Sequence, residues 1–161
     1  MKICYIDRES VRAHMVKQDS KATLSMEKLC AAAGVSPETH EIHMWVSTPS
    51  VNPALRRSLE ALRVTEHVVQ RVDRGLVEVS MAVNYYGLVT DPEEVVFVAA
   101  SGALEPLCDD ILSCSLPVKV VGFSEAISGR LVALPNIEIV CLDEADLDAR
   151  KRGVGHDSVR E

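Results

Sequence analysis

The chain has few aromatic residues and lacks the segments that would mark a membrane or secreted protein. Its 161 residues include one tryptophan, three tyrosines and two phenylalanines. No apolar run approaches the roughly 20 residues that cross a bilayer, so a membrane role has no support. The five cysteines form no CxxC pair, and the opening residues MKICYID contain no signal-like apolar region. We therefore expect a protein of the reducing cytoplasm.

Positive charge is also scarce. Seventeen Lys and Arg residues face 24 Asp and Glu residues, which gives a formal net charge of −7. Binding to nucleic acids depends largely on Lys and Arg at phosphates, so this balance argues against a strongly electrostatic nucleic-acid binder. A bound metal could still recruit a phosphate locally. The hydrophobic content of 47% and charged content of 25% are ordinary for one globular domain.

Short apolar strands alternate with helical segments along the chain, without internal repeats or low-complexity tracts. Residues 75–87 are ambiguous, because Val77, Val79, Met81 and Val83 alternate as in a strand, but the length and context favour a helix. We expect strands at 2–6, 40–46, 66–72, 95–100, 117–122 and 137–142, and helices at 11–33 with a break near Asp19, 53–63 after an Asn52 cap, 75–87, 104–113 and 124–134.

This alternation predicts an α/β fold. Parallel strands need crossover connections, so we expect a three-layer α/β/α sandwich with a mostly parallel central sheet, PIN-like and Rossmann-like, over residues 1–143. Residues 144–161 are expected to form a charged, flexible C-terminal tail.

The strand at 95–100 runs directly into Ser101-Gly102 and a helix, a junction where α/β folds collect ligands. Asp7 ends the first strand, Glu78 lies on the helix at 75–87, and Glu105 follows the junction. These three acids could converge and hold a divalent metal.

Three stretches resemble the NYN domains of the PIN-like nuclease superfamily: residues 6–11 (IDRESV), 77–84 (VEVSMAVN) and 98–107 (VAASGALEPL). The order and spacing of these stretches match the family across most of the chain. The family's metal-dependent RNase activity is attributed to its acidic cluster. The resemblance thus implies an RNA-cleaving domain that uses Mg²⁺ or Mn²⁺.

Carried over to this chain, the resemblance makes Asp7, Glu78 and Glu105 the catalytic and metal-binding residues. Ser10 and Asn84 would orient water or a phosphate oxygen, and the turn at 101–102 would cradle a phosphate. The family has Asn where this chain has Ser10, and Asp where it has Glu78, Asn84, Ala103 and Glu105. Mg²⁺ requires near-octahedral oxygen ligands at about 2.0–2.1 Å, so these departures predict an altered or weakened site.

Each of these residues also has an explanation that needs no function. Asp7 could cap a neighbouring helix, and Glu78 could be a solvated charge. Glu105 lies in a first helical turn, where the helix dipole favours an acid. Residues 101–102 could simply make the tight strand-to-helix turn.

Other candidate residues are interpreted structurally. We expect surface positions for the five histidines, His14, His40, His43, His67 and His156. A basic edge could be formed by Arg56, Arg57 and Arg63 with Lys28 or Arg71, although solvated helix faces are the preferred interpretation of these charges. Tyr85 and Tyr86 could stack on bases, but packing at the end of a helix is the preferred interpretation.

Three functions remain open on the sequence. The first is an NYN-like ribonuclease with a changed acidic site, acting on single-stranded or structured RNA. The second is a catalytically inactive NYN-like module that binds RNA or protein, or forms a homo-oligomer. The third, from fold analogy alone, is a phosphate or small-ligand binder that uses the turn at 101–102.

Overall fold

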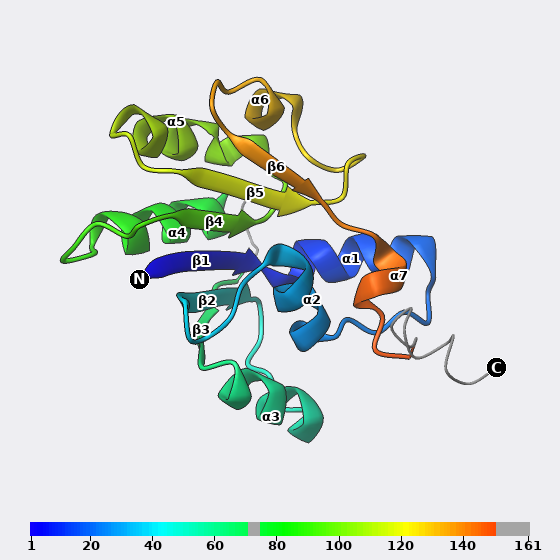
Figure 1. The fold of residues 1–161 in the computed structure, drawn as a ribbon. Coiled ribbons are helices and arrows are strands. Elements are labelled where there is room, and N and C mark those ends of the chain that lie inside the picture. The colour runs from blue at the N-terminus through cyan, green and yellow to red at the C-terminus, as the bar shows by residue number, and fades with distance from the viewer. Residues whose placement is uncertain (71–74, 151–161) are drawn as a thin grey trace.

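The computed structural model describes residues 1–70 and 75–150 of the chain. Six strands form one sheet in the order β3-β2-β1-β4-β5-β6, and all neighbours run parallel. Figure 1 follows the chain from β1 in mid-sheet to β3 at one edge and then across to β6 at the other. The strands are β1 (Lys2–Asp7), β2 (His40–Val46), β3 (Val64–Val68), β4 (Val95–Val98), β5 (Val118–Gly122) and β6 (Glu138–Cys141).

Helices cover both faces of the sheet, which confirms the predicted three-layer α/β/α sandwich. On one face Val11, Met15 and Leu29 pack against Cys4 and Ile6. The alternate residues of β1, Ile3 and Tyr5, contact the helices of the other face. The first face carries α1 (Arg8–Gln18), α2 (Met26–Ala33), α3 (Pro53–Ala61) and α7 (Glu144–Leu147); the second carries α4 (Leu76–Tyr86), η1 (Gly102–Leu104), α5 (Glu105–Ser113) and α6 (Gly129–Val132).

Several predicted elements are confirmed. The strand at 40–46 is β2, and the break near Asp19 separates α1 from α2. Asn52 caps α3 by accepting a hydrogen bond from the Leu55 N–H at 3.1 Å. The ambiguous segment at 75–87 is helix α4.

Two predicted elements were wrong in extent. The strand expected at 66–72 is β3 at Val64–Val68, because Val64 already pairs with Ile42; residues 71 and 72 lie outside the described residues. The helix expected at 124–134 is the four-residue α6. The Ser128 N–H bonds to the Ala100 carbonyl at 2.9 Å, which ties residues 124–128 to the neighbouring loop instead of a helix.

The expected tail begins with packed structure. Leu147 of α7 is fully buried against the first face, and the Ser25 N–H bonds to its carbonyl at 2.9 Å. Asp148 is also buried, where it accepts hydrogen bonds from Arg150. The packed domain therefore extends past residue 143, to at least residue 148. Residues 151–161 of the predicted tail lie outside the described residues.

Among the helices of residues 1–70 and 75–150, none combines the length and apolarity needed to cross a bilayer.

Candidate functional site

The C-terminal ends of β1 and β4 flank the point where the strand order reverses, the usual ligand crevice of such sheets. Asp7 ends β1 there and is buried. Its carboxylate caps α1 by accepting hydrogen bonds from the Ser10 N–H at 3.3 Å and the Ser10 hydroxyl at 2.7 Å. The structure thus brings Asp7 and Ser10 together, and the pair stabilises the start of the helix.

The cavity beside this pair is small. It encloses about 20 Å³, with Ser10, His14 and Phe123 among its lining residues. A volume of this size holds about one water molecule. A nucleotide would need the surrounding loops to move apart.

The turn after β4 is packed against the loop that precedes α6. Ser101 accepts a hydrogen bond from the Ala103 N–H at 3.1 Å and so caps η1. A Cβ atom on Gly102 would lie 2.7 Å from the Ser128 Oγ, closer than real Cβ atoms approach. Gly102 therefore permits the close approach of two loops, and protein atoms cover this side of the turn.

Glu105, in the first turn of α5, pairs with Arg130 of α6. The Nε and Nη2 atoms of Arg130 both lie 2.7 Å from the Glu105 Oε2. A metal ion at Glu105 would have to compete with this guanidinium. The pair is partly solvated, since 63% of the Arg130 side chain and 31% of the Glu105 side chain are exposed.

Glu78 and Asn84 lie on different parts of α4. Glu78 is in its first turn and lines a groove between α4 and α5 together with Ala103. Asn84 accepts a hydrogen bond from the buried Tyr5 hydroxyl at 2.8 Å. Burial raises the pKa of Tyr5, so the hydroxyl stays protonated and needs this acceptor. Asn84 thus has a structural partner at a position that was predicted to orient water or a phosphate oxygen.

The structure does not bring the three predicted metal ligands together. Asp7, Glu78 and Glu105, all of them among the described residues, do not place one carboxylate oxygen each within 4.8 Å of the other two. One divalent ion bound at about 2.0–2.6 Å needs a tighter set of oxygen atoms. This arrangement therefore does not fit a Mg²⁺ or Mn²⁺ ion shared by the three acids.

A different group does converge. Within the described part of the chain, His14, Glu125 and Glu144 place one ligand atom each within 4.8 Å of one another. His14 was expected at the surface, but only 12% of its side chain is exposed and its ring stacks on Phe123 at 4.0 Å. The available signal in the sequence was an acid soon after each of the last two strands, combined with a histidine on the first helix.

The interpretation of His40 and His43 as surface residues was also wrong. His40 is 4% and His43 is 7% exposed, because β2 is an interior strand with both faces covered. His43 Nδ1 lies 2.8 Å from His67 Nε2, and His67 stacks on Trp45. Burial lowers the pKa of both His43 and His67, so both rings favour the neutral form.

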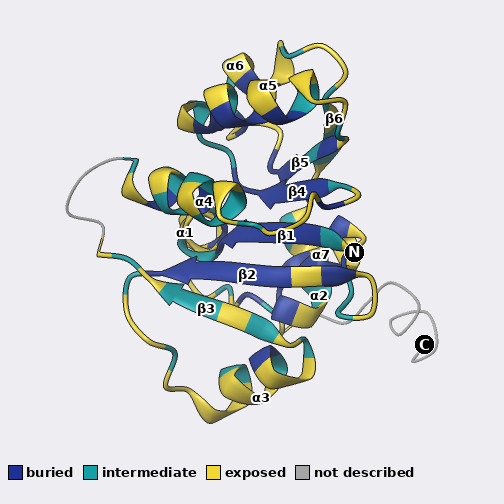
Figure 2. Ribbon diagram, turned by 90° about the vertical axis from the view of Figure 1, so that its left-hand side faces the viewer, coloured by how far each residue is buried: buried dark blue, intermediate teal, exposed yellow. Residues whose placement is uncertain are grey.

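Helix α4 shows an unusual outer surface. Its exposed positions all carry hydrophobic side chains, and we call them the α4 stripe: Leu76 (36% exposed), Val79 (59%), Val83 (68%) and Tyr86 (61%). Figure 2 shows exposed positions along the outward side of α4. The groove beside the stripe encloses about 310 Å³ and is also lined by Ala82 and Pro106.

The tyrosines and the basic residues are distributed unevenly. Tyr85 packs against the core as expected, whereas Tyr86 is exposed and donates a hydrogen bond to Asp110. Of the proposed basic edge, Arg56 lies 3.8 Å from Glu66, and the Lys28 Nζ donates to the Asp148 carbonyl. Arg57 and Arg63 are exposed, and Arg71 lies outside the described residues.

No family model matches the chain, and no curated protein matches it. The chain is similar to the crystal structure of VPA0982, a protein of unknown function from Vibrio parahaemolyticus. The TM-score is 0.64 and the sequence identity 18%, over 91% of this chain and 95% of that one. At this identity the likeness shows the fold alone.

Proposed function

We propose that this chain is an NYN-like assembly domain, in which two copies pair through the α4 stripe, and that it does not hydrolyse RNA at the predicted acidic site. One observation carries the proposal: every exposed position of α4 has a hydrophobic side chain. Apolar residues that serve no packing role within one chain are best explained by an interface.

The spacing of the stripe supports a helix-to-helix contact. Its residues follow one another at intervals of three, four and three, which places them on one face of the helix. By contrast, the outer positions of α3 include Arg56, Arg57 and Glu60, as is usual for a solvated helix. Burying the stripe would stabilise a complex through the hydrophobic effect.

The stripe is also self-complementary. Its positions are symmetric about Met81, so two antiparallel α4 helices related by a twofold axis would place Val79 opposite Val83 and Leu76 opposite Tyr86 of the second copy. Glu78, the only charged residue of α4, would face Asn84 of the second copy. Pairing therefore brings no like charges together along this helix, although each chain carries a net charge of −7.

The groove between α4 and α5 enlarges the surface that a second copy could cover. Ala103 and Pro106 on its far side are exposed and apolar. A specific dimer usually buries about 800 Å² on each partner, more than one short helix provides. We expect the groove to supply the rest of the contact.

The proposal that hydrolysis is absent rests on the partners of the predicted site residues. The Ala103 side chain has no atom that could bind a metal. Asn84 accepts a hydrogen bond from the Tyr5 hydroxyl, and Glu105 forms an ion pair with Arg130. Asp7 is the one predicted metal ligand that stands at the same place and with the same side chain as in NYN domains. A single carboxylate does not hold Mg²⁺ without other oxygen ligands.

The test is the oligomeric state measured by analytical ultracentrifugation from about 1 to 100 µM, a range that brackets a micromolar affinity. We expect a dimer for the wild-type chain and a monomer for Val79→Asp/Val83→Asp. Val132→Asp, on α6 with 54% exposure, is the matched control and should remain dimeric. Circular dichroism checks that each variant is folded. A wild-type monomer throughout the range would contradict the pairing.

The catalytic part is tested separately, with a labelled single-stranded RNA in Mg²⁺ or Mn²⁺. We expect no cleavage by the wild-type chain. Metal-dependent cleavage that disappears in Asp7→Asn from a parallel preparation would contradict the proposal and establish the predicted nuclease. Because one test measures the oligomeric state and the other measures RNA cleavage, each part of the proposal can be contradicted without the other.

A further inference from the structure

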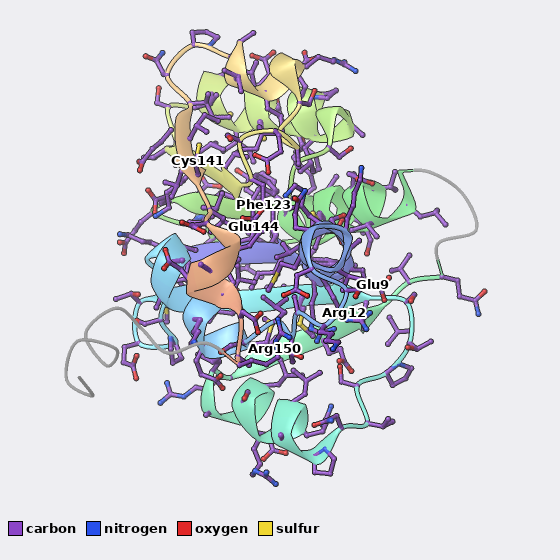
Figure 3. All side chains as sticks on the ribbon, turned by 90° about the vertical axis from the view of Figure 1, so that its right-hand side faces the viewer. Glu9, Arg12, Phe123, Cys141, Glu144 and Arg150 are labelled. Carbon is purple, nitrogen blue, oxygen red and sulfur yellow. The ribbon has the colours of Figure 1, made fainter. Side chains whose placement is uncertain are left out.

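Three elements that are distant in sequence meet at His14. The His14 Nε2 atom lies 2.9 Å from Glu125 Oε1 and 3.2 Å from Glu144 Oε1. His14 belongs to α1, Glu125 follows β5, and Glu144 begins α7. Figure 3 labels Phe123 and Glu144 beside α1. The convergence therefore depends on the tertiary fold.

Hydrogen bonding alone does not account well for this arrangement. An imidazole nitrogen carries at most one proton, so Nε2 cannot make a full hydrogen bond to each of two carboxylates. The two carboxylates repel each other at short range. A cation placed between the three atoms removes both problems, since it accepts an electron pair from each.

The surroundings hold the ligand atoms in place. The His14 ring stacks on Phe123 with an angle of 13° between the planes, which fixes its orientation. The Ser124 hydroxyl lies 3.0 Å from Glu125 Oε2, which leaves Oε1 directed at His14. Contacts of this kind orient ligands in known metal sites.

We propose that His14 Nε2, Glu125 Oε1 and Glu144 Oε1 bind a first-row divalent transition-metal ion, best fitted by Zn²⁺, with water as the fourth ligand. Tetrahedral Zn²⁺ with bonds of about 2.0–2.2 Å separates its ligand atoms by about 3.4 Å. The distances from His14 Nε2 to the two glutamate oxygens, 2.9 and 3.2 Å, are shorter than this by a few tenths of an ångström. The glutamate side chains, 56% and 36% exposed, have room to open by that amount.

The donor set selects the class of ion. Imidazole nitrogen suits Zn²⁺ and its transition-metal neighbours, whereas Mg²⁺ and Ca²⁺ prefer oxygen ligands alone. Two carboxylates neutralise the charge of the ion. Three protein ligands and an open position are also the pattern of zinc sites that activate water. The site shares no residue with the predicted set of Asp7, Glu78 and Glu105, and none with the α4 stripe.

The test is titration with Zn²⁺ by isothermal calorimetry, in a Cys114→Ser/Cys141→Ser background that removes the exposed thiols. We expect one Zn²⁺ per chain. In that background, Glu125→Gln/Glu144→Gln and, separately, His14→Asn should weaken binding at least tenfold. The matched control, Glu60→Gln/Glu138→Gln, makes the same charge change at exposed positions on other elements and should bind as the background does.

A second measurement is the visible absorption of the Co²⁺ complex, which reports tetrahedral coordination directly. We expect bands in the background and in the control, and their loss in both site variants. No binding at 100 µM Zn²⁺ in the background, or equal affinity in the site variants, overturns the proposal. Displacement of Zn²⁺ by millimolar Mg²⁺ would overturn the assigned class of ion.

Discussion

Two groups of acidic side chains in this molecule differ in how their carboxylates are engaged. Asp7 and Glu105 each lie in a first turn or cap where a nearby partner engages the carboxylate: Ser10 for the first and Arg130 for the second. Glu125 and Glu144 instead approach a shared atom of His14 from two separate segments, the loop after β5 and the start of α7. An acid in a suggestive motif is therefore weaker evidence for a site than acids that converge on one point.

The largest expected effect is stabilisation by Zn²⁺. A ligand that binds only the folded state at 100 times its Kd raises the free energy of unfolding by about 2.7 kcal/mol. Urea unfolding of the Cys114→Ser/Cys141→Ser background should show this gain with Zn²⁺, and Glu125→Gln/Glu144→Gln in that background should not. Mg²⁺ at the same concentration should leave both proteins unchanged. Equal stabilisation by Mg²⁺ would contradict the proposal that the His14 group binds a transition-metal ion selectively.

The next effect concerns Asp7. Replacing a capping Asp with Ala costs about 1–2 kcal/mol, and Asn caps nearly as well. We therefore expect Asp7→Ala to lower the free energy of urea unfolding by that amount and Asp7→Asn to lower it by much less. Ser10→Ala removes the hydroxyl donor and should lie between the wild type and Asp7→Ala. Equal losses for Asn and Ala would indicate that the charge of Asp7 matters more than its cap.

A smaller effect should appear as a pH dependence of stability. The folded-state pKa values of His43 and His67 are lowered mainly by burial, so the unfolded chain takes up protons more readily than the folded one. Their contribution is fully present above the unfolded pKa of about 6.5 and is lost as the pH falls below it. Urea unfolding between pH 7.5 and 5.5 should show this decline, and His67→Gln should make it shallower. An unchanged slope in the variant would assign the decline to other groups.

The smallest effect is expected at Glu105. Ion pairs with solvated partners contribute about 0–1 kcal/mol, and more than half of the Arg130 side chain is exposed. Glu105→Gln should therefore change the free energy of unfolding by less than 1 kcal/mol, and 0.5 M NaCl should reduce the difference further. A loss well above this value would mean that Glu105 stabilises the fold by more than its pair with Arg130.

The layer architecture and most elements could be predicted because buried parallel strands appear as short apolar runs. The pattern of residues 75–87 did not distinguish a helix from a strand, and the α4 stripe explains why. Val79 and Val83 lie outside the core, while Val77 and Met81 lie inside it, so apolar residues occupy both sides of one helix. When core residues and an exposed apolar stripe lie on opposite sides of one helix, the apolar residues do not show the helical period of 3.6 residues.

The converging group at His14 could not be predicted in the same way. His14 lies 111 residues before Glu125 and 130 before Glu144, and no local motif links it to either. Histidines were misplaced for a related reason: in an interior strand such as β2, alternation does not distinguish buried from exposed residues. Helix α6 was overestimated because the bond from Ser128 to Ala100 is a tertiary contact that local sequence does not encode.

The contact between Gly102 and Ser128 has an evolutionary consequence. A side chain at position 102 would collide with the Ser128 side chain, so substitutions at the two positions cannot accumulate independently. Among homologues, a larger residue at 102 should appear together with glycine at 128 or with a changed loop length before α6. The turn after β4 and the segment that delivers Arg130 should thus be inherited as one unit, even where the acids around them vary.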